Sequence, residues 1–421
     1  MVETDPYMTL NYIWLAFFLI SFGIALVQWM VTGDTQVFKT IVDGIFKSAG
    51  DSVDLSFKLI GIMTLFLGFM NIGEKAGAIR FLSRIVGPFF GKLFPEVPKQ
   101  HPALGHMMMN FSANLLGLDN AATPFGLKAM ESLQELNPKK ETASNAQIMF
   151  LVLHASGLTL IPVSIIAMRA AVKPPSANPT DIFIPCMIAT FAATVVALIV
   201  VSIRQKINLL QPVILGWILG ISALIGLLIW YLKTFLDQPG IERFSSVMSN
   251  GLIILIFLAF LLGGMRKKIN VFEAFVDGAK GGFEIAIKII PYLVAMLVAI
   301  SVLRNSGAFD YLISGLNSLF SYLGFQTDFV TALPTALMKP LSGSGSRAMM
   351  IDTMTKYGAD SFAGRLSAVF QGSSDTTFYV VAVYFGSVSV KDTRYAIPSM
   401  LLADLAGIIT AIMVAYLFFG T

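Results

Sequence analysis

The segment NFSANLLGLDNAATP, residues 110–124, interrupts a very apolar chain with amide, carboxyl and hydroxyl side chains. A second polar segment, PLSGSGSR, occupies residues 340–347, and QGSSDTT follows at residues 371–377. Hydrocarbon offers no hydrogen bonds, so irregular polar backbone persists at membrane depth only where it is buried in protein or lines a watery cavity. These segments therefore predict a path or pocket for something polar inside a membrane protein.

The composition indicates that the partner of most of the surface is a lipid bilayer. Hydrophobic residues make up 56% of the chain and charged residues 13%, whereas soluble domains contain roughly 25% charged residues. Apolar stretches that approach the ~20 residues of a membrane span occur at 12–31, 59–72, 182–203, 213–232, 252–264, 285–303 and 395–419, with less uniform ones at 148–168 and 378–390. We expect an all-α, multi-pass protein of about ten spans in the bacterial cytoplasmic (inner) membrane.

The distribution of charge argues against two other classes. The residues before the first span include Glu3 and Asp5 and no basic residue, whereas a cleaved signal peptide begins with a basic region. The net charge of +4 is small and no basic run is interleaved with aromatic residues, so we expect no nucleic-acid partner.

The chain contains an internal repeat, which we divide into a first unit at 1–210 and a second at 211–421. Ordered matches join Val42-Asp43-Gly44 to Val276-Asp277-Gly278, Gly77-Ala78 to Gly307-Ala308, and Ile184-Pro185 to Ile397-Pro398. Repeated halves with interrupted apolar segments in corresponding positions are typical of secondary transporters.

The relative orientation of the two repeats depends on how residues 110–124 meet the membrane. A re-entrant hairpin there makes the second repeat inverted, and a full crossing makes it parallel. The run Arg266-Lys267-Lys268 marks a cytoplasmic loop by the positive-inside rule, and counting from it favours inverted repeats. Apolar periodicity at 38–46 and 272–279 also predicts two amphipathic helices, lying at the membrane interface or packed between spans.

The first polar segment supplies candidate substrate-binding residues. With Pro124 in the first turn of a helix and Asn120 or Thr123 as its N-cap, the free N–H groups of the helix would suit an anionic or carbonyl-bearing solute. The alternative is a turn whose polar groups satisfy one another. The candidates are Asn110, Ser112, Asn114, Asp119, Asn120 and Thr123.

The second polar segment adds Ser342, Ser344, Ser346 and Arg347. Its glycines permit close approach of the backbone, but it lacks the Lys-Ser/Thr ending of a nucleotide-binding loop. Arg347 is suited to neutralising a carboxylate on a solute, or to pairing with Asp352 or Asp375 within the protein.

Two further elements, HASGLTLIP at 154–162 and QGSSDTTFY at 371–379, place hydroxyl groups inside apolar stretches. Gly157, Pro162 and Gly372 would interrupt helices there. The alternative is that the hydroxyls bond back to their own helices. Intramembrane acids mark ion pathways, so Asp119 and Asp375 are candidates for coupling to H⁺ or Na⁺. The substrate-binding candidates are Ser156, Thr159, Gln371, Ser373, Ser374, Asp375, Thr376 and Thr377.

No catalytic set emerges. Three histidines, one cysteine and scattered acids give neither a metal-ligand spacing nor a nucleophile motif. His154 is interpreted as a hydrogen-bonded structural residue. We expect a protein that is not an enzyme and that uses no cofactor or metal.

Long strings in both repeats resemble known membrane proteins. NFSANLLGLDNAATPFGLKAME and LTLIPVSIIAMR resemble spore maturation protein A-like sequences, while PLSGSGSRAMMIDTM, GRLSAVFQGSSDTTFYVVAVYFGSV and RYAIPSMLLADLAG resemble spore maturation protein B-like sequences. The chain is thus similar to the nucleoside-recognition, or Gate, family, as a fusion of two kinds of member. The resemblance implies a core similar to that of concentrative nucleoside transporters and leaves the solute open.

These observations favour a membrane transporter of a small polar solute, either a nucleoside or an amino-acid-like compound. Two alternatives remain, a non-transporting scaffold in the cell envelope or in spore maturation, and a channel. A homo-oligomer is a candidate assembly.

Overall fold

The computed structural model describes residues 6–117 and 119–420, and it is helical throughout this part of the chain. The elements up to residue 205 are α1 (Pro6–Thr32), α2 (Gln36–Ala76), α3 (Ala78–Leu93), α4 (Pro102–Leu115), α5 (Asp119–Leu136), α6 (Asn145–Ser156), α7 (Val163–Ala171) and α8 (Phe183–Gln205). They are followed by α9 (Pro212–Phe235), α10 (Gln238–Arg266), α11 (Val271–Asn305), α12 (Ala308–Tyr322), the 3₁₀ helix η1 (Asp328–Ala332), α13 (Leu333–Met338), α14 (Gly343–Tyr357), α15 (Phe362–Gly372), α16 (Thr377–Ser387) and α17 (Ala396–Phe419).

Seven of the described helices are long and apolar enough to cross a membrane, namely α1, α2, α8, α9, α10, α11 and α17. They contain all seven of the clear apolar stretches that the sequence indicates. The two less uniform stretches belong to interrupted pairs of shorter helices, α6 with α7 and α15 with α16. The multi-pass helical prediction is therefore confirmed, while the total of about ten spans stays a prediction.

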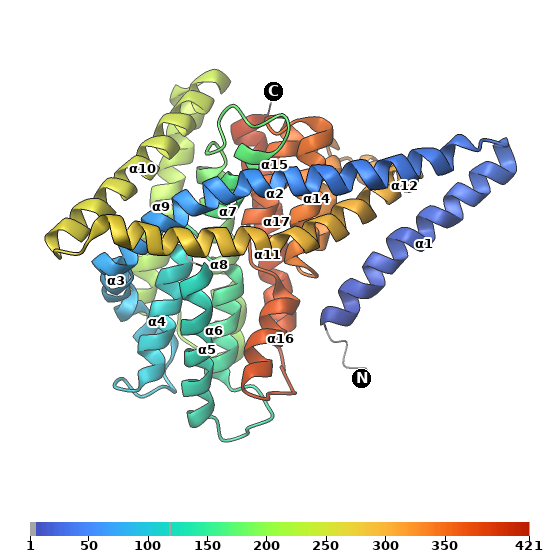
Figure 1. Ribbon diagram of the computed structural model, residues 1–421. Helices are drawn as coiled ribbons and strands as arrows, with labels where there is room; N and C mark the ends of the chain where they lie inside the picture. The colour runs from blue at the N-terminus through green and yellow to red at the C-terminus, as the bar shows by residue number, and fades with distance from the viewer. Residues whose placement is uncertain (1–5, 118, 421) are drawn as a thin grey trace.

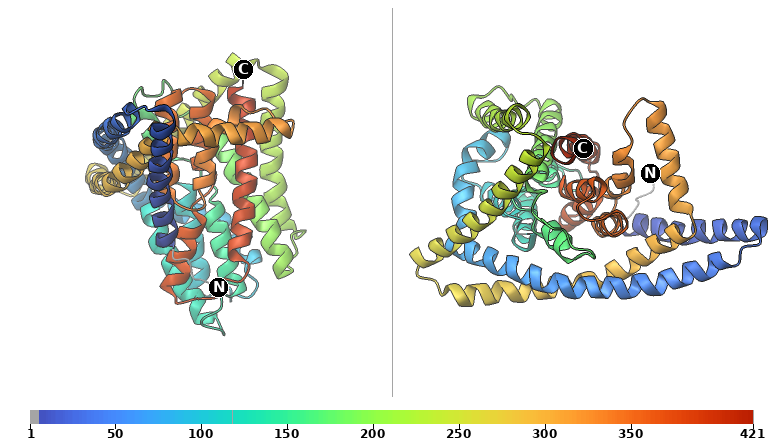
Figure 2. Two further views of the ribbon diagram at one scale, coloured as in Figure 1. Left: turned by 90° about the vertical axis from the view of Figure 1, so that its right-hand side faces the viewer. Right: turned by 90° about the horizontal axis from the view of Figure 1, so that it is seen from above.

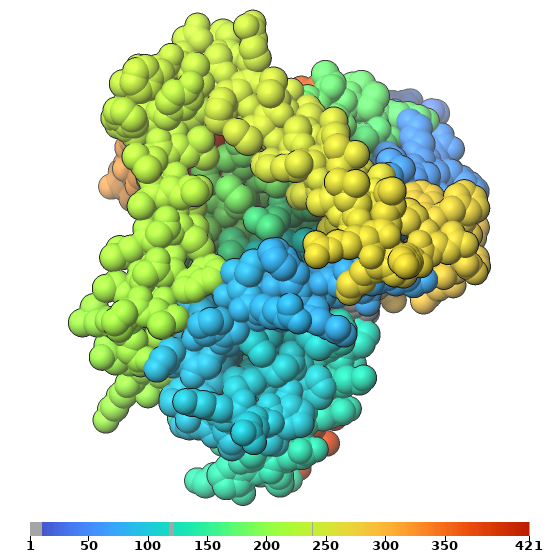
Figure 3. All heavy atoms as spheres, turned by 90° about the vertical axis from the view of Figure 1, so that its left-hand side faces the viewer, coloured from blue at the N-terminus to red at the C-terminus, as the bar shows by residue number. Residues whose placement is uncertain are grey.

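Large apolar side chains cover the outer helices. Leu227 on α9 is 65% exposed and Ile254 on α10 is 60% exposed. Figure 3 shows α9 and α10 along one side of the molecule, next to α2 and α3. Burying such surface in hydrocarbon is favourable, so these helices fit a lipid environment.

The helices α2 and α11 form a long antiparallel pair that crosses the bundle containing α8, α9 and α17 (Figures 1 and 2). Their backbones approach closely at two glycines of α11. A Cβ atom on Gly278 would lie 2.4 Å from the carbonyl oxygen of Leu67, and one on Gly282 would lie 2.7 Å from the backbone of Met63. Small residues spaced four apart permit this kind of packing between membrane helices.

The amphipathic stretches at 38–46 and 272–279 are helical, as predicted, but they do not form helices of their own. Both stretches belong to the first turns of α2 and α11, which are uninterrupted helices of 41 and 35 residues in total. Phe275 explains part of the apolar pattern, because its ring packs on Phe69 of α2 at a centroid distance of 5.5 Å. The apolar face therefore joins the two long helices at Phe275, whereas Phe46 and Phe272 are exposed.

Two helical hairpins enter the bundle from opposite ends. The beginning of α4 and the end of α5 lie near Asn145, whose side chain donates to Glu96 and accepts from Arg394 and Tyr395. The hairpin α13–α14 starts and finishes at the other end. There η1 contacts Tyr416 near the end of α17, and the residues after α14 contact Arg169.

We predict that Gly282→Leu destabilises the protein, because the new side chain would meet the backbone of Met63. Overpacking a tight contact costs about 1–3 kcal/mol. Unfolding in detergent, followed by circular dichroism, measures the effect. Gly61→Leu on α2 is the matched control, since no atom lies within 4 Å of a Cβ at that position. Equal losses in the two variants would contradict close packing between α2 and α11.

Candidate solute-binding site

Two interrupted helices meet in the middle of the bundle. The helix α6 ends at Ser156, and Gly157 follows with a left-handed backbone (φ 40°) before Pro162 introduces α7. The helix α15 ends at Gly372, and four non-helical residues separate it from α16. Both interruptions lie where Gly157, Pro162 and Gly372 predict them.

The interruptions and the hairpin tips share backbone hydrogen bonds. The N–H of Leu160 donates to the carbonyl of Leu115 at the tip of α4–α5, at 2.8 Å. The N–H of Phe378 donates to Pro340 at the tip of α13–α14, at 3.1 Å, and the N–H of Asp375 donates to Ala155 at 2.7 Å. Each interruption therefore bonds one hairpin, and the third bond joins the two interruptions.

Gly117 is required at the tip of the first hairpin. It has φ +71°, and a Cβ there would lie 2.4 Å from the carbonyl oxygen of Ile161. A positive φ is accessible to glycine without strain. The sequence therefore allows this tip to reach the interruption between α6 and α7.

The start of α5 differs from the prediction. The helix begins at Asp119, so Pro124 is its sixth residue rather than a first-turn residue, and Thr123 lies inside the helix rather than at its N-cap. The side chain of Asn110 donates to the carbonyl of Ala122 at 2.7 Å, which supports the turn that precedes Pro124. In the second hairpin, Ser342 is the N-cap of α14 and accepts a hydrogen bond from the N–H of Gly345 at 3.0 Å.

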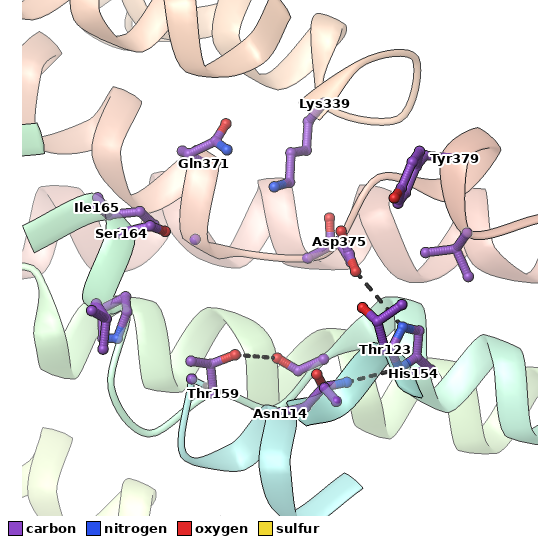
Figure 4. Close-up of a pocket in the computed structure, with 18 of the residues that line it drawn as sticks. Asn114, Thr123, His154, Thr159, Ser164, Ile165, Lys339, Gln371, Asp375 and Tyr379 are labelled. Atoms are coloured by element: carbon purple, nitrogen blue, oxygen red, sulfur yellow. Dashed lines mark hydrogen bonds and ion pairs between the residues drawn. The ribbon is translucent and has the colours of Figure 1, made fainter. Parts of the chain in front are cut away.

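A cavity of about 370 Å³ lies where the interruptions and the hairpin tips meet. One wall comes from α4–α7 and carries Asn114, His154 and Thr159, and the other comes from α13–α16 and carries Lys339 and Asp375 (Figure 4). The candidates from the sequence that line it are Asn114, Thr123, Thr159, Arg347, Gln371, Ser374 and Asp375.

The other candidates have different places. Asn110, Ser112, Ser156, Ser346, Ser373, Thr376 and Thr377 are buried in the protein around the cavity. Ser156 donates to the carbonyl of Leu153, and Ser346 donates to that of Thr335. Ser344 bonds to the capping residue Ser342 at 3.2 Å. Asp119 and Asn120 begin α5, but their side chains lie outside the described part of the structure.

His154 belongs to the cavity wall as well as to an internal network. Its Nδ1 atom lies 2.8 Å from Nδ2 of Asn114 and 3.0 Å from Oδ1 of Asn110. Its Nε2 atom lies 3.8 Å from Oδ2 of Asp375, which is within ion-pairing distance when the imidazole is protonated. The prediction that His154 is a hydrogen-bonded structural residue therefore holds for its Nδ1 atom. Its Nε2 atom faces the carboxylate of Asp375 across the cavity.

Lys339, Ser164, Tyr379 and Tyr384 also line the cavity and were missed. Lys339 is 5% exposed, and a lysine directly before PLSGSGSR in an apolar stretch was a usable signal. With Arg347 and Asp375, it gives the walls both signs of charge. Asp352, one of the two partners suggested for Arg347, has Arg304 as its main contact instead. Nε of Arg304 lies 2.7 Å from both carboxylate oxygens of Asp352.

A buried cluster around Arg169 fixes the outer ends of α7 and α15. Arg169 is fully buried, and its Nη2 atom lies 2.8 Å from Asp181 and 3.2 Å from Asp360, while Nη1 donates to the carbonyl of Ala359. Arg365 on α15 contacts the second oxygen of Asp181 at 2.8 Å. The cluster thus holds together the two helices whose other ends border the cavity.

Comparison with known proteins identifies relatives of both parts of the chain. The family model described as "Gate: Nucleoside recognition" matches residues 56–172 and 286–391. Spore maturation protein B of Bacillus subtilis (strain 168) is 47% identical over 174 residues, which cover 41% of this chain and 96% of that protein. Spore maturation protein A of the same organism is 39% identical over 190 residues, which cover 45% of this chain and 92% of that protein. No solved structure gives a significant match.

We predict that Arg169→Met strongly destabilises the protein, because it removes the fully buried cation that joins Asp181 to Asp360. Breaking a buried ion pair from one side costs about 3–5 kcal/mol. Thermal unfolding in detergent measures the loss, with Arg243→Met as the control because Arg243 is exposed on α10. Unchanged stability of Arg169→Met would show that the cluster does not hold α7 and α15.

Proposed function

Because the chain belongs to the nucleoside-recognition (Gate) family, we propose that it is a membrane transporter of a small polar solute. The observation that carries the proposal is the polar cavity between two interrupted helices, inside a bundle of apolar helices. Interrupted helices near the membrane midplane form the solute sites of many secondary transporters.

The proposal includes two inverted repeats, with units at 1–210 and 211–421 and a core similar to that of concentrative nucleoside transporters. Its support is a matched order of elements: a long helix, a short helix, a hairpin, an interrupted helix and a spanning helix. The two long helices, α2 and α11, run antiparallel, and the two hairpins enter from opposite ends. An inverted pair of units would produce both features.

The charges of the loops give an orientation in the inner membrane. The loops at the Asn145 end carry Lys99, Lys139, Lys140, Lys206, Lys391 and Arg394. The loops at the opposite end carry fewer basic residues, among them Lys173. Short cytoplasmic loops are rich in Lys and Arg, so the Asn145 end is assigned to the cytoplasm.

The cavity favours a solute that is neutral or carries charges of both signs. Asn114, Thr159 and Ser374 offer hydrogen-bond donors and acceptors. Lys339 and Arg347 suit a carboxylate, and Asp375 suits an amine, so an amino-acid-like zwitterion fits as well as a nucleoside. A volume of about 370 Å³ is within the usual range for small-molecule sites. H⁺ and Na⁺ are the candidate coupling ions, with Asp119 or Asp375 contributing.

The second candidate function is a non-transporting scaffold of the cell envelope. It draws on the printed names of the two relatives, which refer to spore maturation. A scaffold needs no solute, so its cavity would bind none. A channel would conduct without saturation, and a homo-oligomer is compatible with each of the three functions.

We predict that the purified protein in proteoliposomes takes up at least one of uridine, glutamine and glutamate with saturation. Asn114→Ala should lower this uptake about tenfold, because one lost hydrogen bond to a solute contributes about 1–1.5 kcal/mol. Radiolabelled initial rates measure the effect.

Asn208→Ala is the matched control, since Asn208 lies in the exposed loop after α8 and should leave uptake unchanged. A folded wild-type protein that transports none of the three solutes, with or without ion gradients, would contradict the transporter proposal and favour the scaffold.

A further inference from the structure

Asp404 is a buried acid in the middle of the spanning helix α17. It is 2% exposed and faces the interruption between α15 and α16. The hydroxyl of Thr377, the first residue of α16, lies 2.6 Å from its Oδ2 atom. Its Oδ1 atom is buried and makes no short hydrogen bond among the described residues, although the Ser374 hydroxyl lies near enough to interact with the carboxyl group. Thr377 therefore makes the short hydrogen bond to this carboxyl group.

The protonated and ionised forms of Asp404 differ in how well this site accepts them. An ionised carboxylate at membrane depth is costly, and leaving one of its oxygens without a hydrogen bond adds to the cost. The hydroxyl of Thr377 donates to Oδ2 of the carboxylate, and a neutral carboxyl can instead donate its own proton to the same hydroxyl oxygen. The hydrogen bond is therefore available to both forms, so Asp404 can bind and release a proton without losing its partner.

Charged groups near Asp404 connect it to the cavity. Lys339, at the end of α13, and Asp375, on the interruption, are charged groups near Asp404. Both residues line the cavity. On the neighbouring helices, Nε2 of His154 in α6 lies 3.8 Å from Asp375. The thiol of Cys186 in α8 lies near Lys339. A proton at Asp404 therefore changes the charge balance at the cavity wall.

We propose that Asp404 is a proton-binding site, and that its proton drives the transport proposed above, on which this coupling role rests. When Asp404 is ionised, it offsets the charge of Lys339. When it is protonated, this compensation is lost and Lys339 attracts a negative group of the solute more strongly. The protein then binds a proton from the water outside the membrane together with a solute that has such a group. When Asp404 loses the proton to the water on the other side, the protein binds the solute more weakly.

Infrared difference spectroscopy of the full chain in lipid vesicles tests the proton site with protons as the probe. Acid-minus-alkaline spectra of the wild type should contain a carbonyl stretch from a buried protonated carboxyl. Asp404→Asn should lack this band and retain the hydrogen bond to Thr377. Asp310→Asn should keep the band, because Asp310 is exposed on α12, with 68% of its side chain accessible. A band that is unchanged in Asp404→Asn would overturn the assignment.

A second variant covers the case in which Asp404→Asn does not fold. Thr377→Val keeps the carboxyl and removes the hydroxyl that contacts it, so the wild-type band should shift in frequency and in its pH midpoint. An unshifted band in Thr377→Val would also overturn the assignment.

The coupling role is tested with glutamine or glutamate, whichever the wild type takes up faster, because both carry the carboxylate that the coupling requires. Uptake of uridine alone would overturn the coupling role. An inside-alkaline gradient should drive accumulation by the wild type. Asp404→Asn should still exchange the solute but accumulate it only to the level reached without a gradient. Gradient-driven accumulation by Asp404→Asn would overturn the coupling role. No uptake by the wild type would overturn the transporter proposal and the coupling with it, while the infrared band decides the proton site by itself.

Discussion

The hydrogen bonding of the backbone at membrane depth is the constraint on which the rest of the structure depends. Two helices stop and restart inside the bundle, which frees N–H and carbonyl groups that hydrocarbon cannot satisfy. Three backbone hydrogen bonds satisfy some of these groups: the N–H of Leu160 donates to the carbonyl of Leu115, that of Asp375 to Ala155, and that of Phe378 to Pro340. The interruptions are stable because two hairpin tips reach them, and the cavity forms where all four meet.

The surrounding parts hold these elements in place. The buried Arg169 cluster fixes the outer ends of α7 and α15 at one end of the bundle. At the other end, Asn145 joins the loop before α4 to the loop before α17. The pair α2 and α11, in contact at Gly278 and Gly282, braces one side. Polar contacts at both ends thus leave the middle of the bundle free for a cavity.

Local sequence signals predicted much of this arrangement. The apolar stretches predicted the seven helices that are long and apolar enough to cross a membrane, and Gly157, Pro162 and Gly372 predicted the interruptions. Signals failed where distant parts of the chain decide the outcome. The first turns of α2 and α11 have an interfacial pattern, yet they continue into long helices that pack on each other at Gly278, Gly282 and Phe275. The roles of Arg169 and Lys339 were not predicted, because they depend on residues far away in the sequence.

Cysteine labelling in native membranes tests most directly whether the meeting point of the interrupted helices is a watery site. The single native cysteine, Cys186, is buried, so Cys186→Ser provides a background. Thr159→Cys, on the cavity wall, should react with a small hydrophilic thiol reagent, while Ala189→Cys, fully buried in α8, should not. Equal protection of both cysteines in the folded protein would contradict the central claim that a polar solute can reach this cavity.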